Sequence, residues 1–147
     1  MGQQQLLLLV LSTVIVGLAT VAGIQAFSEN QAQADQDALT QRGVTIVSDM
    51  KAAINKPTQL GGVDSDNSAK EALQAAGYDT DNTTIDVPGA TGGNCSVDTF
   101  APGSDPALSV SCSGGEATQT STVNMGSNGN ITTTIGTTSG SGGNSSS

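Results

Sequence analysis

The two cysteines of this chain are its clearest candidates for chemistry, either as a disulfide or as metal ligands. Cys95 and Cys112 are the only cysteines among 147 residues, and the chain contains no histidine. In a chain with a membrane-type N-terminal segment, two cysteines form one disulfide more often than half of a metal site. With no histidine and no third cysteine, the chain lacks the nitrogen and sulfur ligands from which structural zinc sites are built. We therefore expect a Cys95–Cys112 disulfide and no cofactor.

Two Asp-x-Asp clusters are the second group with possible chemistry. Asp64 and Asp66 precede a short predicted helix, and Asp79 and Asp81 follow it. Carboxylate oxygens are ligands that calcium prefers, but neither cluster has the glycine and the distal glutamate of an EF-hand loop. Aspartate is also a common turn residue. Solvated turns are therefore favoured over a calcium site.

The remaining composition argues against catalysis and against nucleic acid as a partner. The chain shows no nucleophile paired with a base and no phosphate-binding loop, so we expect no enzyme. Thirteen acidic residues face four basic ones, which gives a net charge of −9. No basic patch can be assembled from Arg42, Lys51, Lys56 and Lys70.

The element on which the rest depends is the apolar run near the N-terminus. Between Leu6 and Ile24 the only polar side chains are Ser12, Thr13 and Thr20. As a helix these nineteen residues span roughly 28 Å, about the hydrocarbon thickness of a bilayer. A cleaved secretory signal fits less well, because Met1–Gln5 lacks a basic residue and the run exceeds the ~7–15 residues of such a signal. A membrane anchor and a polymer subunit are the other two interpretations.

The helix is predicted to continue beyond the apolar run. Residues 27–56 are rich in helix formers and contain no proline before Pro57. The whole element would then be about fifty residues and roughly 75–80 Å long. Its second half has one apolar stripe on which a small domain could pack, formed by Leu39, Gly43, Ile46, Val47, Met50, Ala53 and Ile54.

The remainder of the chain predicts a short helix and several strands. Ser68 and Glu71 form a capping box that begins a helix over residues 69–76. Strand patterns follow over 83–87, 95–100, 107–112, 119–125 and 131–135.

One hairpin register explains the cysteines. If Cys95 pairs with Cys112, then Val97 faces Val110 and Thr99 faces Leu108, all on one side. In the second hairpin Val123, Met125, Ile131 and Ile135 would point inward.

The predicted fold class is α+β, a long N-terminal helix packed on a small antiparallel sheet of about four strands with one disulfide hairpin. We divide the chain into an apolar transmembrane or filament-core helix (1–26) and its amphipathic continuation (27–56). A small globular head (57–136) and a flexible Gly/Ser-rich tail (137–147) follow.

The two-part helix of residues 1–56 resembles the N-terminal helix of type IV pilins and pseudopilins. In that family a prepilin peptidase cuts after a glycine and the new N-terminus is methylated, which would place Met1 at the methylated position. The fifth residue is usually glutamate, so Gln5 is a departure at the inter-subunit docking position. A cut after Gly2 would place Leu7 fifth, which matches the family less well. Gly17 and Gly23 lie where such helices often melt in filaments.

The resemblance implies a structural subunit of an extracellular type IV pilus-like filament on the cell surface. The partners would be copies of itself in a helical homopolymer, the membrane before assembly, and the peptidase and pilus assembly machinery. The alternatives are a membrane-anchored or secreted binding module that never polymerises, and a minor pseudopilin of a secretion system. The expected filament core consists of Leu6, Leu7, Leu8, Leu9, Val10, Leu11, Val14, Ile15, Val16, Leu18, Val21, Ile24 and Phe27.

Overall fold

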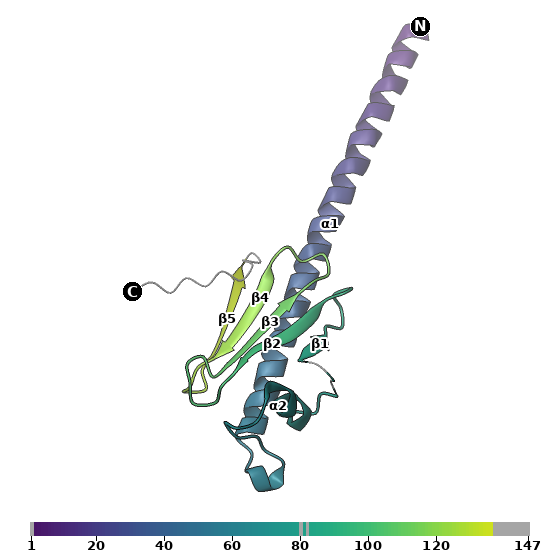
Figure 1. The fold of residues 1–147 in the computed structure, drawn as a ribbon. Coiled ribbons are helices and arrows are strands. Elements are labelled where there is room, and N and C mark those ends of the chain that lie inside the picture. Colours follow the sequence, from purple (N-terminus) through teal and green to yellow (C-terminus); the bar gives the residue numbers. More distant parts are fainter. Residues whose placement is uncertain (1, 80, 82, 137–147) are drawn as a thin grey trace.

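The computed structural model describes residues 2–79, 81 and 83–136, and Figure 1 shows their arrangement. A single long helix runs along one side of a small head and projects far beyond it. The elements in chain order are α1 (Gly2–Ile54), the 3-10 helix η1 (Thr58–Leu60), α2 (Ala69–Ala75), β1 (Thr84–Asp86), β2 (Asn94–Phe100), β3 (Leu108–Ser113), β4 (Thr120–Met125) and β5 (Ile131–Gly136).

Helix α1 confirms the prediction of one unbroken element. Its 53 residues correspond to a length of about 80 Å. The helix ends at Ile54, three residues before Pro57, which cannot continue a helix. Of the predicted stripe only Ile54 is half-buried, and the six buried residues are Leu39, Gly43, Ile46, Val47, Met50 and Ala53.

The sheet packs on this buried stripe. Its five antiparallel strands follow the chain order β1-β2-β3-β4-β5, so each strand pairs with the next along the chain. The core joins the stripe of α1 to Leu73 of α2 and to Leu108, Val110 and Val123 of the central strands, all fully buried. The predicted α+β class is confirmed, with five strands where about four were expected.

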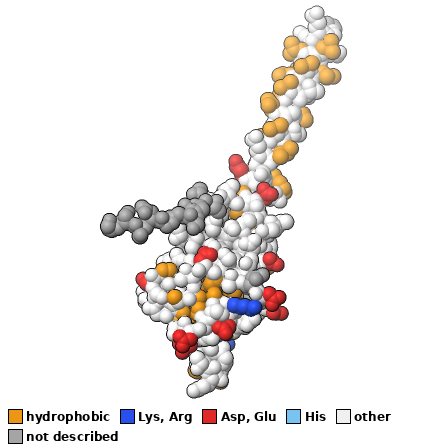
Figure 2. All heavy atoms as spheres, viewed as in Figure 1, with side chains coloured by type: hydrophobic (Ala, Val, Ile, Leu, Met, Phe, Trp, Pro, Cys, Tyr) orange, Lys and Arg blue, Asp and Glu red, His pale blue; other side chains and the backbone are white. Residues whose placement is uncertain are grey.

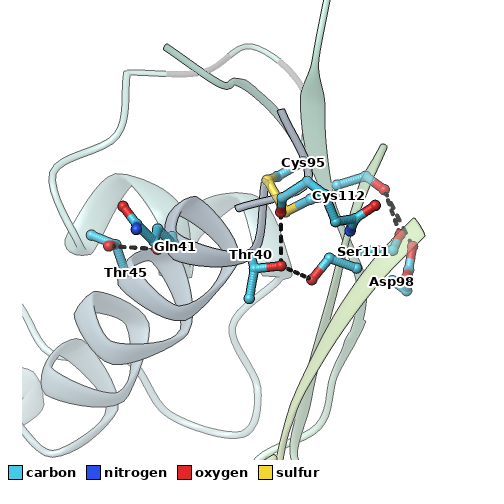
Figure 3. The surroundings of a disulfide bond; sticks show 10 residues. Thr40, Gln41, Thr45, Cys95, Asp98, Ser111 and Cys112 are labelled. Carbon is cyan, nitrogen blue, oxygen red and sulfur yellow. Dashed lines mark hydrogen bonds between the residues drawn. A yellow bond between two sulfur atoms is a disulfide. The ribbon is translucent and has the colours of Figure 1, made fainter. Parts of the chain in front are cut away.

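The Cys95–Cys112 disulfide is present and lies at the centre of this core. The two residues are opposite each other in the β2–β3 register, with their Cα atoms 4.0 Å apart. Both are fully buried, and Figure 3 shows the bridge beside the turn of α1 that carries Thr40. The predicted pairing of Val97 with Val110 is also confirmed.

Two details of the strand predictions are wrong. The register shifts between Val97 and Thr99, so that Thr99 faces Ser109 and not Leu108. Asp98 is the extra residue of this bulge, which a strict period of two cannot anticipate. In the edge strand β5, Ile135 is 49% exposed, because within the described residues β5 has a neighbouring strand on one side only.

Small and hydroxyl-bearing residues let α1 approach the sheet closely. A Cβ atom on Gly43 would lie 2.9 Å from Val123 Cγ2 and 3.2 Å from Cys112 Sγ, so the helix surface touches both. One turn earlier, the Thr40 hydroxyl donates to the Gln36 carbonyl (2.9 Å) and lies 3.0 Å from Ser121 Oγ. Ser121 is fully buried, and this contact satisfies its hydroxyl.

Helix α2 begins at the predicted capping box. The Ser68 side chain accepts from the Glu71 backbone N–H, and the Glu71 carboxylate accepts from the Ser68 backbone N–H (2.7 Å). The hydrogen bond from the Ser68 backbone N–H, followed by those from the Ser68 hydroxyl and the Asn67 amide to the same carboxylate, lowers the pKa of Glu71. The helix is one residue shorter than predicted and ends at Ala75.

The close approach at Gly43 makes a testable prediction. Gly43→Ala should destabilise the head, because overpacking costs about 1–3 kcal/mol while the gain in helix propensity is only about 1 kcal/mol. Neither neighbour can move cheaply, since Val123 is β-branched and Cys112 is fixed in the disulfide. Thermal unfolding in detergent, followed by circular dichroism, measures the effect.

The matched control is Gly23→Ala in the same helix, where an added Cβ meets nothing within 4 Å. It should leave the melting temperature of the head unchanged. A Gly43→Ala chain that melts at or above the wild-type temperature would contradict the contact.

The disulfide makes a second prediction. Replacing both Cys95 and Cys112 with alanine removes a cross-link between residues 17 apart in sequence, which should cost about 3 kcal/mol. Urea unfolding of the double variant, of the reduced wild type and of the oxidised wild type checks this. We expect the first two to unfold at similar, lower urea concentrations, and equal midpoints for all three would refute a stabilising role.

Candidate functional site

The most unusual surface of the molecule is the projecting half of α1. All thirteen large apolar side chains from Leu6 to Phe27 are 50–72% exposed, and none is covered by the head. They are the residues expected to form the filament core. Figure 2 shows them as orange side chains along the whole projecting helix, whereas red carboxylates are scattered over the head. Because Leu6–Leu11 are consecutive and all exposed, the apolar surface surrounds the helix and does not form a single stripe.

Two of the three hydroxyl side chains between Leu6 and Ile24 are satisfied within the helix itself. The Thr13 hydroxyl donates to the Val10 carbonyl and the Thr20 hydroxyl donates to the Gly17 carbonyl, each at 2.8 Å. Such internal hydrogen bonds remove the need for water at these positions. The segment is consequently suited to lipid or to a protein interior, where every polar group must find a partner.

This half of the helix meets the physical requirements of a membrane span. In the part of the chain that the structure describes, α1 is the one helix long and apolar enough to cross a bilayer. In water the same surface is unfavourable, since each fully buried Leu, Val or Phe contributes ~1.5–3 kcal/mol. Either lipid or other copies of the chain could provide that burial.

The processing and docking positions predicted from the family resemblance are at the start of α1. Met1 lies outside the described residues, and Gln5 is exposed in the first turns of the helix. The helix is continuous through Gly17 and Gly23 in the single chain. The predicted melting there concerns the assembled filament, so it stays a prediction.

Two charged side chains fix α1 to opposite ends of the sheet. Asp35 Oδ2 accepts from the Glu116 backbone N–H at 2.7 Å, in the β3–β4 loop. Lys51 Nζ donates to the Gly129 carbonyl at 2.8 Å, in the β4–β5 turn. These contacts are sixteen residues apart on one rigid helix, so they fix the direction in which the apolar half leaves the head. Sequence reasoning missed both, because each partner is a backbone group that only the fold brings near.

A third contact ties α1 to the segment after α2. The Tyr78 hydroxyl donates to Asp49 Oδ2 at 2.6 Å, and the Arg42 guanidinium lies 5.3 Å from the centre of the Tyr78 ring. Burial, followed by the hydrogen bond to Asp49, raises the pKa of Tyr78 to about 12. The neutral phenol is therefore a structural anchor of the head.

The two aspartate clusters are not brought into one site. Asp79 and Asp81 line a shallow hollow together with Arg42 and Asp86. Asp64 instead accepts from the backbone N–H of Ser65 at 2.7 Å, within its own turn. In residues 2–79, 81 and 83–136, no three histidine, cysteine or acidic side chains gather as metal ligands. Both the turn and the calcium interpretation stay predictions.

Comparison of the chain with protein-family models, with curated proteins and with solved structures finds no match. A functional proposal consequently depends on the residues and on their geometry.

The raised pKa of Tyr78 makes a pH prediction that one residue reports. The chain has one tyrosine and no tryptophan, so the ultraviolet absorbance of the phenolate follows Tyr78 alone. We expect titration near pH 12 in the folded chain and near pH 10 in denaturant. The stabilisation is present below pH 10 and is lost as the pH rises through the folded value, because deprotonation requires the buried contact to open.

Tyr78→Phe is the control for stability. The wild type should lose stability as the pH rises toward the folded pKa of Tyr78. The variant has no phenol to ionise, so it should lose less. Equal pKa values in the folded and unfolded chains would show that the contact with Asp49 is absent in solution.

Proposed function

We propose that this chain is a structural subunit of an extracellular filament of the type IV pilus kind, which polymerises through the apolar half of α1. The observation that carries the proposal is the uncovered apolar surface from Leu6 to Phe27, exposed on every side of a helix that the head holds firmly. A surface apolar all round can be covered completely in the centre of a helical bundle. The head would then form the exterior.

Before assembly the same helix would anchor the chain in the membrane with the head outside. A single apolar span of this length supports the anchored state. The Cys95–Cys112 disulfide supports an exterior head, because disulfides persist in oxidising compartments. Transfer from the bilayer to the polymer exchanges lipid contacts for protein contacts. We therefore assign that step to a pilus assembly machinery, as the family resemblance implies.

The start of the helix would be the processing and docking end. If this chain is the mature form, the resemblance places the methylated amine at Met1, and the alternative cut after Gly2 would place it at Gln3. In a neighbouring copy Gln5 would accept a hydrogen bond from that amine through its neutral carbonyl. One charged partner makes such a bond worth ~1.5–3 kcal/mol, and a glutamate would make it stronger. Docking here should consequently depend more on apolar packing than it does in family members with glutamate.

The proposal gives the chain a structural role without catalysis. A membrane-anchored or secreted binding module would use the head and leave the helix in the membrane or lose it. A minor pseudopilin would be present in few copies and would not form long polymers. Both alternatives differ from a major filament subunit in the amount of sedimentable polymer.

Charged substitutions in the apolar half test the proposal. Leu8→Asp and Val16→Asp should each abolish polymer, because a carboxylate would be buried unpaired in the bundle. The disulfide and the thermal unfolding of the head should be unchanged, since neither side chain touches the head. Electron microscopy of filaments sheared from cells measures polymer, and an equal amount of folded, disulfide-bonded chain in the membrane excludes a defect in export.

Thr132→Asp is the matched control, because Thr132 is an exposed residue of β5 far from the apolar half. It should polymerise like the wild type. A Leu8→Asp chain that polymerises normally would refute assembly through this helix. A wild-type chain that is found on cells only in the membrane, with no filaments, would favour the non-polymerising binding module.

A further inference from the structure

The sheet has two edges, and they differ in how well they are protected against pairing with another strand. Among the described residues, β1 lies at one edge and β5 at the other (Figure 1). Strand β1 has only three residues, ends at the charged Asp86 and is followed two residues later by Pro88. Short length, charge and proline are features by which natural proteins block an edge strand.

Strand β5 has none of these protective features. Its six residues, Ile131–Gly136, contain no proline and no charged side chain, and their pairing with β4 is regular, without a bulge. All residues from 131 to 135 are β-branched, which favours an extended strand. Residues 132–135 are also exposed. A regular, uncharged and exposed edge strand is a template on which a further strand can pair.

The backbone of β5 offers hydrogen-bonding groups to such a strand at alternate residues. The Gly126 N–H donates to the Asn130 carbonyl at 2.9 Å, which closes the β4–β5 hairpin. Hydrogen-bonded and non-hydrogen-bonded pairs alternate along an antiparallel ladder, so Thr132 and Thr134 direct their backbone groups toward β4. The backbone groups that point away from β4 belong to the alternate residues Ile131, Thr133 and Ile135.

The sequence of β5 is complementary to itself. Residues 131–135 read Ile-Thr-Thr-Thr-Ile, which is the same in both directions around Thr133. An antiparallel copy centred on Thr133 would place Ile131 opposite Ile135 of the second copy, and the outward N–H and C=O groups of both strands would pair. Ile135, which is 49% exposed in the single chain, would then be covered by an isoleucine.

The distribution of charge also favours this edge as the place where two copies meet. The chain carries a net charge of −9, so two copies repel each other over much of their surface. Glu116 is the last charged residue, and residues 117–147 contain none. Strands β4 and β5 are therefore neutral, and a second copy can pair along β5 without placing one carboxylate opposite another.

We propose that β5 pairs antiparallel with β5 of a second copy, which joins the two sheets into one. This inference rests on the proposed function. The two-fold axis of such a pair is perpendicular to the sheet, so it reverses the direction of α1, which packs along the sheet (Figure 1). In the proposed filament all helices point the same way. The contact therefore joins two filaments that lie side by side and run in opposite directions.

Cysteine cross-linking in sheared filaments tests the register of the contact. In Thr133→Cys the two new cysteines would face each other across the two-fold axis with Cα atoms about 5.5 Å apart, which a disulfide can bridge. Mild oxidation should produce covalent dimers. Thr132→Cys is the matched control on the same strand, because its two copies would be offset by about 7 Å along the strands and should stay monomeric. Peptide mapping checks that the Cys95–Cys112 bridge is intact.

Thr133→Lys tests the same contact without oxidation. Two ammonium groups would face each other across the axis, and lysine on an edge strand opposes pairing. Electron microscopy of sheared material should show bundles of filaments in the wild type and single filaments in the variant. Thr99→Lys, at an exposed threonine of the interior strand β2, is the control and should bundle like the wild type. An unchanged melting temperature shows that each head is folded.

The outcomes separate this inference from the proposed function. Wild-type filaments that never bundle, or a Thr133→Cys chain that dimerises no more than Thr132→Cys, would overturn the edge pairing and leave the filament core intact. A cross-link from Thr133→Cys to a different protein would overturn it as well, because the edge would then take another partner. A wild type without filaments would remove the proposed function, and this inference with it.

Discussion

The constraint on which the structure depends is the exposure of an apolar helix about half the length of α1. Thirteen large apolar side chains there are 50–72% exposed, and the head covers none of them. The head packs only against the second half of the helix, along the stripe from Leu39 to Ala53, and leaves the first half exposed. One rigid element thereby serves two environments, an aqueous exterior at the head and an apolar interior at the N-terminus.

A head with few large apolar residues needs other sources of stability. Its core contains no aromatic side chain that is fully buried among the described residues, and the disulfide occupies the centre of the contact between α1 and the sheet. Gly43 lets the helix approach that bridge, and Thr40 satisfies the buried hydroxyl of Ser121. Asp35 and Lys51 then fix the helix to the two ends of the sheet. The direction of the projecting half is consequently a property of the head.

Local rules predicted much of this arrangement from sequence. The length of α1 follows from the absence of proline before Pro57, and the start of α2 from the Ser68–Glu71 capping box. Once Cys95 was paired with Cys112, the period of two placed Val97 correctly opposite Val110. The bulge at Asp98 could not be predicted in the same way, because it depends on how β2 pairs with β3. The contacts of Asp35, Lys51 and Tyr78 were also missed, since each joins residues at least 29 apart in sequence through the tertiary fold.

The most direct measurement is mass spectrometry of the chain sheared from the surface of cells, with its N-terminus mapped. If the apolar helix is the filament core, the released chain should keep Leu6–Ala26 and should begin with a methylated residue at or near Met1. Retention in material free of membrane means that protein and not lipid covers the helix. A released chain that begins near Phe27 would show that the apolar run is a discarded signal, which contradicts assembly through α1.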